Sequence, residues 1–281
     1  TQYSADYTLY SGDAAYNENA ALKDGLVPCV NQEPVPAEDI YIPQEMSAEA
    51  YLVLTSVRIS DPSAAVDSKA VLSYSSNMYV SQDAIFLDAT SWMQWDGTTI
   101  ARINFSDGSF TPAGACTVPG TIDDSFSMDE ASDGTFRAAS TVYGDTSSCG
   151  VYTFDKDMNS LGSVTGIAEG ENLRSARFLD HVCYLVTYKN MDPLFTVDLS
   201  DPKNPVLLGE LSISGFSEYL HFWGEDKLLG FGYETDPETG EFLALKLSMF
   251  DISDPSNVSE ISKIVLKNVT DSSALADYKA M

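Results

Sequence analysis

The sequence DLSDP at residues 198–202 recurs almost unchanged as DISDP at residues 251–255, each time directly after an apolar segment. Asp and Ser side chains accept hydrogen bonds from backbone N–H groups two residues further on, and Pro fixes the backbone, so the pattern predicts a turn at the end of a strand. Degenerate copies stand at three earlier places. The five copies are marked by one aspartate each: Asp61, Asp107, Asp157, Asp201 and Asp254.

The spacing of these turn markers predicts the fold. Successive markers lie between 44 and 53 residues apart, and repeats of about 40–50 residues are typical of four-stranded propeller blades. Four short segments rich in β-branched and aromatic residues fit between two markers, and no long run repeats with helical periodicity. We therefore predict an all-β chain, a β-propeller with four-stranded antiparallel blades and about five blade equivalents.

The repeat also divides the chain. We expect an irregular arm or insertion over residues 1–50 and propeller blades over residues 51–281. The expected units are a partial blade at 51–73, blades at about 74–121, 122–169, 170–214 and 217–268, and a partial blade at 273–281. If the two partial blades join, they close a ring. Left apart, they would expose sheet edges, which soluble proteins normally avoid.

The charge of the chain excludes some partners. The sequence has 42 acidic and 15 basic residues, a net charge of -27. This field repels nucleic acid, and no cluster of Lys or Arg offers a contact for anionic lipid. No apolar run is long enough to span a membrane. Such acidity suits solubility outside the cell, and the lack of a signal peptide at Thr1 fits a chain from which one has been removed.

The cysteines point to no metal or redox motif. Cys29, Cys116, Cys149 and Cys183 are widely spaced and form no Cys-x-x-Cys, which excludes a zinc knuckle or a thioredoxin-like site. Four cysteines allow three disulfide pairings, and the sequence does not choose among them. We expect Cys183, inside an apolar run, to be a buried free thiol, whereas Cys116 and Cys149 lie at strand ends and could pair.

Several short motifs between residues 118 and 280 carry a family resemblance. They include SFSMDE at 125–130, YLVTY at 184–188, DPLF at 192–195 and FDISDP at 250–255. With them, the chain resembles secreted bacterial and archaeal proteins that carry a C-terminal β-propeller domain distantly related to WD-repeat propellers. The resemblance implies an exported or cell-surface protein and a propeller larger than this chain. It supplies no catalytic residues. Tyr278 replaces a usual His, and Asp123-Asp124 replace a usual Asn-Gln.

The metal and catalytic motifs among the remaining residues are incomplete. His181 and His221 are the only histidines, which excludes a three-His metal site, and a structural role is expected for each. Asp155, Asp157 and Asn159 have the spacing of the first calcium-loop ligands, but the turn Gly and the Glu at position twelve are missing. Calcium is thus a weak hypothesis there, and no other cofactor is indicated. Paired carboxylates would serve glycoside hydrolysis, yet no spacing singles out a pair.

Aromatic residues supply the binding candidates. Trp92 and Trp95 lie between two expected strands, and Tyr219 and His221 lie together in another. Exposed rings of this kind would contact a sugar or a partner protein, although rings at strand ends more often pack on the core. We therefore predict an extracellular or cell-surface binding or scaffold propeller whose protein or glycan partner meets the loops at a blade end. The alternatives are a carbohydrate-active hydrolase with paired carboxylates in the central channel and a structural part of a larger cell-envelope protein. The sequence favours a non-enzymatic role without deciding the question.

Overall fold

The computed structural model describes residues 27–42, 50–73, 77–88, 97–188, 192–236 and 238–277. Their secondary structure is nearly all β, arranged in several four-stranded antiparallel sheets, so the predicted fold class is confirmed. The chain divides into two compact units, residues 1–117 and residues 118–281. Strand β9 (Ser109–Pro119) runs across this boundary. Within the described ranges, no helix has the length and apolarity needed to cross a membrane.

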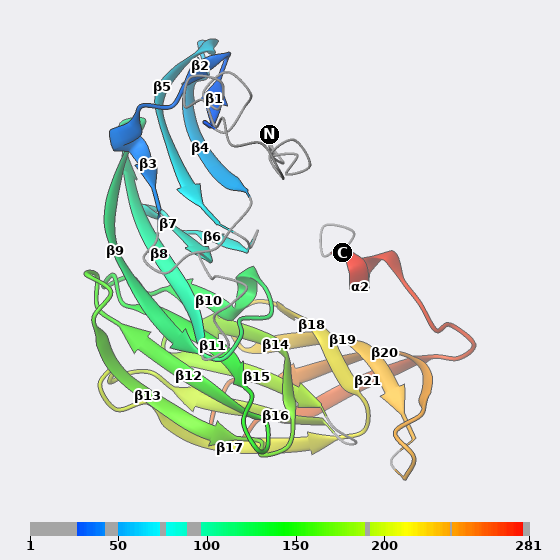
Figure 1. Ribbon diagram of the computed structural model, residues 1–281. Helices are drawn as coiled ribbons and strands as arrows, with labels where there is room; N and C mark the ends of the chain where they lie inside the picture. The colour runs from blue at the N-terminus through cyan, green and yellow to red at the C-terminus, as the bar shows by residue number, and fades with distance from the viewer. Residues whose placement is uncertain are drawn as a thin grey trace, which may run out of the picture. The chain divides into compact units, whose positions relative to one another are not determined.

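The first unit contains two larger sheets and a small hairpin (Figure 1). Their cores join in a cluster of Leu54, Val71, Ile85, Leu87 and Ile103. The hairpin is β1 (Cys29–Val30) and β2 (Glu33–Pro34), followed by the short helix η2 (Ala37–Asp39). The three-stranded sheet has the order β3 (Ile40–Tyr41), β5 (Asp61–Leu72), β4 (Tyr51–Arg58). The four-stranded sheet comprises β6 (Met78–Val80), β7 (Ala84–Asp88), β8 (Gly97–Ser106) and β9 (Ser109–Pro119).

The arm expected over residues 1–50 is therefore not irregular throughout. Strand β3 pairs in parallel with β5, with Ile40 opposite Ala70 and Tyr41 opposite Val71. Asp39 anchors the same crossing through an ion pair with Lys69 at 2.9 Å. Two-residue strands have too little sequence to show a two-residue periodicity, which explains why the pattern did not reveal them.

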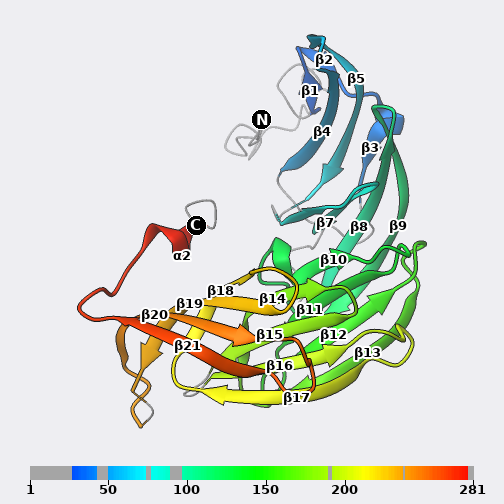
Figure 2. The same cartoon turned by 180° about the vertical axis from the view of Figure 1, so that it is seen from behind.

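The second unit consists of three four-stranded antiparallel sheets whose strands follow one another in sequence order (Figures 1 and 2). The first sheet is β10 (Met128–Glu130), β11 (Phe136–Val142), β12 (Ser148–Phe154) and β13 (Ser160–Ile167). The second is β14 (Asn172–Leu179), β15 (Val182–Tyr188), β16 (Asp192–Asp198) and β17 (Val206–Ile213). The third is β18 (Phe216–Phe222), β19 (Lys227–Thr235), β20 (Phe242–Asp251) and β21 (Ser259–Leu266). A short helix, η3 (Ser125–Ser127), precedes β10.

The second sheet is buried on both faces. On β15, Cys183 and Leu185 belong to the core shared with the first sheet, whereas Tyr184 and Val186 belong to the core shared with the third. Successive side chains of a strand point to opposite faces. A strand covered on both sides therefore needs a continuous apolar run, and that is the sequence found at 182–186.

The repeated turns do more than end strands. Asp201 and Asp254 each accept a hydrogen bond from the backbone N–H two residues on, at 3.0 Å in both cases. The carbonyl group of the following proline then reaches the preceding sheet, where Thr153 Oγ1 donates to Pro202 at 2.5 Å and Thr196 Oγ1 donates to Pro255 at 2.7 Å. Each turn thus joins two neighbouring sheets.

The other three markers differ in detail. Asp107 has a φ of +52° and is followed by Gly108 at +82°, which gives a two-residue hairpin of the kind favoured by Asp-Gly. Around Asp157 the accepting side chain is that of Asp155, which receives hydrogen bonds from the backbone of Asp157 and Asn159. Asp61 is the first residue of β5 and accepts a hydrogen bond from the Ser63 hydroxyl.

Two expectations need correction. A partial blade was expected at residues 273–281, but Ser273–Ala276 form the short helix α2 instead of a strand. The Ser272 side chain caps it by accepting from the backbone N–H of Ala274, a start signal that the strand assignment overlooked; residues 278–281 lie outside the described ranges. Cys183 is a buried free thiol as predicted, but Cys116 and Cys149 are also free thiols rather than a pair. Burial raises the pKa of both to about 12.

Candidate functional site

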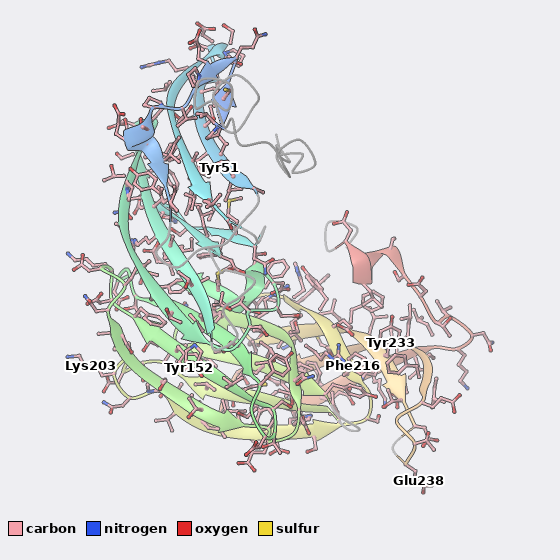
Figure 3. All side chains as sticks on the ribbon, in the orientation of Figure 1. Tyr51, Tyr152, Lys203, Phe216, Tyr233 and Glu238 are labelled. Carbon is pink, nitrogen blue, oxygen red and sulfur yellow. The ribbon has the colours of Figure 1, made fainter. Side chains whose placement is uncertain are left out.

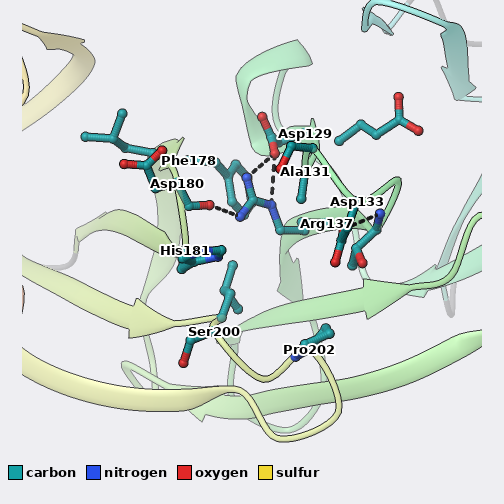
Figure 4. A pocket seen from close by; sticks show the side chains of 14 residues that line it. Asp129, Ala131, Asp133, Arg137, Phe178, Asp180, His181, Ser200 and Pro202 are labelled. Carbon is teal, nitrogen blue, oxygen red and sulfur yellow. Dashed lines mark hydrogen bonds and ion pairs between the residues drawn. The ribbon is translucent and has the colours of Figure 1, made fainter.

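A pocket of about 350 Å³ opens in the second unit where three turns meet (Figure 4). The turn between β10 and β11 and the turn between β14 and β15 supply two walls, and the loop between β16 and β17 supplies the third. Pockets of this size hold small ligands or single groups of larger ones. We call it the hairpin-end pocket.

Arg137 of β11 forms the inner wall of the pocket and is only 4% exposed. Its Nε donates to Asp129 Oδ2 at 2.9 Å, Nη2 donates to the same oxygen, and Nη1 donates to the carbonyl oxygen of Asp180. The guanidinium also lies over the Phe178 ring, 5.2 Å from its centroid. Every nitrogen of this group has a partner, so Arg137 holds the first and second sheets together.

The rest of the polar lining consists mainly of acceptors. Asp133 accepts a hydrogen bond from the backbone N–H of Thr135 at 2.9 Å. This bond, together with one from the Thr135 hydroxyl, lowers the pKa of Asp133 below its usual value, which keeps the carboxylate ionised. Glu130 and Asp180 add two more carboxyl groups. Asp180 has a φ of +47°, a backbone region that Asp tolerates better than most residues.

His181 follows Asp180 in the same turn and is exposed to solvent at the pocket wall. The Ser200 hydroxyl lies on the opposite loop (Figure 4). Because the Arg137 guanidinium is already hydrogen-bonded to Asp129 and Asp180, the pocket offers carboxylates, an imidazole and hydroxyls to a ligand. Such a lining recognises a ligand that brings hydrogen-bond donors, either hydroxyl or amino groups.

Of the binding residues chosen from sequence, Tyr219 and His221 do not line this pocket. Trp92 and Trp95 lie outside the described residues. Tyr219 and His221 both lie on β18, with their rings stacked at 6.1 Å and the Tyr219 hydroxyl 3.2 Å from His221 Nδ1. His181 does line the pocket, although the sequence suggested only a structural histidine. The signal that could have found it is its place in the turn between the first two strands of a blade.

The calcium hypothesis has a simpler structural account. Asp155 Oδ1 accepts from the backbone N–H groups of Asp157 and Asn159 at 2.9 and 2.8 Å, and the Asn159 amide also donates to the same carboxylate. These bonds form the turn between β12 and β13. In the described part of the chain, no three His, Cys, Asp or Glu side chains are grouped so as to hold a metal ion.

Comparison with known proteins identifies relatives of this chain. The model of the family described as a beta propeller domain matches residues 3–281. An uncharacterised protein of Methanocaldococcus jannaschii is 39% identical over 193 residues, which cover 67% of this chain and 29% of that protein. An uncharacterised protein of Archaeoglobus fulgidus is 38% identical over 154 residues, 55% of this chain and 23% of that protein. The chain thus spans less than a third of the length of these curated relatives.

Two solved structures show a likeness of fold alone. A cobalt-substituted apocarotenoid oxygenase of Synechocystis aligns with a TM-score of 0.49 at 12% identity, covering 79% of this chain and 56% of the oxygenase. The propeller domain of the Trilobed protease from Pyrococcus furiosus aligns with a TM-score of 0.42 at 12% identity, covering 66% of this chain and 56% of that one.

Proposed function

Because this chain belongs to the beta propeller domain family, we propose that it is a secreted or cell-surface binding module whose hairpin-end pocket receives hydroxyl or amino groups of a glycan or protein partner. The observation that carries the proposal is the pairing of Arg137. With all its nitrogens engaged by Asp129 and Asp180, the charged groups left in the pocket are carboxylates, which only accept hydrogen bonds. The position at a blade end, where turns from two sheets meet, is one where propellers gather variable loops.

The net charge of -27 supports a role outside the cell and a partner that is not a polyanion. A basic patch on a protein or the hydroxyls of a neutral glycan would both satisfy the pocket. Trp92 and Trp95 remain candidates for an additional aromatic contact, and Trp92→Ala/Trp95→Ala belongs in the same experiment.

The proposal is tested by screening the whole chain on a glycan array and against a Gly-Lys repeat peptide. Asp180→Asn and His181→Ala remove an anion and an imidazole from the pocket, and both positions are exposed. Asp226→Asn is the matched control, because Asp226 occupies the corresponding turn of the third sheet, and its carbonyl accepts from Ile252 as that of His181 accepts from Leu199. We expect binding that weakens about tenfold in the pocket variants and not in the control. Equal binding by all variants would remove the pocket from the proposal.

A carbohydrate-active hydrolase is the second candidate, and two carboxyl groups favour it. Burial raises the pKa of Asp123 and of Glu218 above their usual values, and the charge of Arg174 opposes the rise in both. Glycoside hydrolysis requires one carboxyl group with a raised pKa and a second, ionised one nearby, and the charge of Asp123 contributes to the rise in the pKa of Glu218. Release of reducing sugar from polysaccharides by the native chain, abolished in Asp123→Asn and Glu218→Gln, would establish this activity. Equal release by the native chain and both variants would dismiss these two residues.

A further inference from the structure

The innermost strands of the second unit leave regular pairing at corresponding places. On β14 the register passes from Leu173 opposite Thr187 to Ser175 opposite Val186, so Arg174 is an extra, bulged residue. On β18 it passes from Ser217 opposite Gly232 to Tyr219 opposite Phe231, so Glu218 is bulged in the same way. Bulges redirect side chains and are frequent beside functional sites. The same bulge occurs in two strands of neighbouring sheets and carries a positive side chain in one and a negative side chain in the other. This repetition indicates a functional arrangement.

The first sheet contributes to the same place through helix η3. Asp124 caps this helix by accepting from the backbone N–H groups of Phe126 and Ser127 at 2.9 and 3.0 Å. η3 contacts β14, and β14 in turn contacts β18. The three sheets thus bring together a set of polar and aromatic side chains that we call the inner-strand cluster: Asp123, Asp124, Phe126, Arg174, Arg177, Glu218 and Tyr219.

Arg177 is the most enclosed member of the cluster, with 8% of its surface exposed. Its guanidinium carbon lies 3.4 Å from the centroid of the Phe126 ring and 4.8 Å from that of Tyr219. Nη1 donates to the carbonyl oxygen of Ala176 at 2.9 Å. Burial lowers the pKa of this guanidinium, and the Asp124 carboxylate and a side-chain hydrogen bond with the Tyr219 hydroxyl oppose that fall. Nη2 itself is buried and has no hydrogen-bond partner among the described residues. An unpaired buried donor on a charged group is costly, so an acceptor from outside these residues is indicated.

Arg174 presents a second donor of this kind. Its guanidinium lies over Tyr188 and Phe216, 5.6 and 5.7 Å from the ring centroids. Its Nε is also buried without a hydrogen-bond partner in the described ranges. The charge of Arg174 acts on Asp123 and Glu218, as their pKa values show, but no ion pair within 4 Å joins Arg174 to either of them in the described structure.

The balance of charge selects the class of ligand. Two guanidinium groups face three carboxyl groups, and the chain as a whole carries a charge of -27, so an anion would be repelled. A cation would be repelled by the two arginines. The donors of Arg174 and Arg177 and the acceptors of Asp123 and Glu218 call for a neutral molecule that both accepts and donates. Each hydroxyl group of a sugar does both. We infer that the inner-strand cluster is a binding site for a neutral saccharide, separate from the hairpin-end pocket.

The test is calorimetric titration of the whole chain with the methyl glycosides of glucose, mannose and galactose. Glucuronate serves as an anionic probe and trialanine amide as a peptide probe. At least one neutral glycoside is expected to bind with a dissociation constant on the order of millimolar, and Arg177→Gln and Arg174→Gln are each expected to weaken it about tenfold. Lys203→Gln is the charge-matched control, because Lys203 is exposed on the loop between β16 and β17, well apart from Phe216 (Figure 3).

Arg174 is only half-buried, so Arg174→Gln keeps the test valid if Arg177→Gln fails to fold, which circular dichroism would reveal. Binding of none of the three glycosides would overturn the inference, as would equal affinity in the arginine variants and the control. Preference for glucuronate or for trialanine amide would also overturn it, in favour of an anion or a peptide. Asp180→Asn is titrated in parallel: if affinity falls in that variant and not in the arginine variants, the sugar occupies the hairpin-end pocket, which contradicts this site but supports the proposed function.

Discussion

Arg137 and Arg177 are two buried arginines of the same unit with opposite states of pairing. They are 4% and 8% exposed, and each lies over an aromatic ring. Every nitrogen of the Arg137 guanidinium has a protein partner, whereas Nη2 of Arg177 has none in the described structure. Burial alone therefore does not reveal the role of a charged group. The paired arginine joins two sheets, and the incompletely paired one is the arginine that we assign to a ligand.

The largest difference between Arg137 and Arg177 is expected in the free energy of unfolding of their variants. Arg137→Met leaves the Asp129 carboxylate without its ion pair and should lower the free energy of unfolding by about 3 kcal/mol, as for other broken buried pairs. Arg177→Met removes a ring contact but also an unpaired donor, so its loss should stay within about 1 kcal/mol. Urea denaturation of the two variants measures both values.

The double variant Arg137→Met/Asp129→Leu is the control for this pair, because replacing both charges by apolar groups avoids the stranded carboxylate. It should lose less stability than Arg137→Met alone. If Arg177→Met instead proved as destabilising as Arg137→Met, the distinction between a structural and a ligand-facing arginine would fail.

The sequence predicted the fold class because the signals of its turns are local. The turn markers need only an Asp and its immediate neighbours, and the period between markers then implies four-stranded sheets. The two sites depend on register instead. A bulge at Arg174 or Glu218 adds one residue to a strand, and the residue types around it do not predict where this extra residue lies. The pairing of Arg137 with Asp129 likewise depends on the length of the turn between β10 and β11. The sequence shows His181 in a turn, but its place in a pocket follows only from the way three turns meet in the folded structure.

The comparison extends to the contacts between sheets. Gly162 and Gly209 lie opposite Thr153 and Thr196, whose hydroxyls donate to the turns of the next sheet. A Cβ at Gly162 would lie 2.6 Å from the carbonyl oxygens of Pro202 and Lys203, whereas one at Gly209 would lie 3.3 Å from that of Ser256. Gly162→Ala should therefore lower the free energy of unfolding by about 2 kcal/mol, within the range for overpacked sites. Gly209→Ala should change it by less than about 1 kcal/mol. Thermal unfolding followed by circular dichroism compares them, and a greater loss in Gly209→Ala would contradict the close approach of the Pro202 turn.

The threonine hydroxyls provide a smaller effect. Thr153→Val and Thr196→Val each remove one hydrogen bond to a proline carbonyl and should each lower the free energy of unfolding by about 1 kcal/mol. Thr153→Ser and Thr196→Ser keep the hydroxyl and should lose clearly less. If the Val variants matched the Ser variants in urea denaturation, these hydrogen bonds would not join the sheets in the way described.

The smallest effect concerns pH and the exposed turn markers. The pKa of Asp201 is lowered by hydrogen bonds from the Asn204 side chain and the Lys203 backbone, and that of Asp254 by those from Ser256. A carboxylate with a lowered folded-state pKa contributes stability above its unfolded value, about 4, and that contribution disappears as the pH falls through the folded-state pKa. Asp201→Asn/Asp254→Asn should therefore lose less thermal stability than the native chain between about pH 5 and pH 3. Parallel melting curves for the two proteins would contradict this role.

The most direct test of the central claim is a calorimetric titration of the native chain, Arg177→Gln and Lys203→Gln with the neutral methyl glycosides. The unpaired Nη2 of Arg177 predicts that a glycoside binds the native chain and the Lys203 variant alike and that a folded Arg177 variant binds it about tenfold more weakly. Equal affinities in all three proteins would contradict the claim that this buried arginine is kept for a ligand.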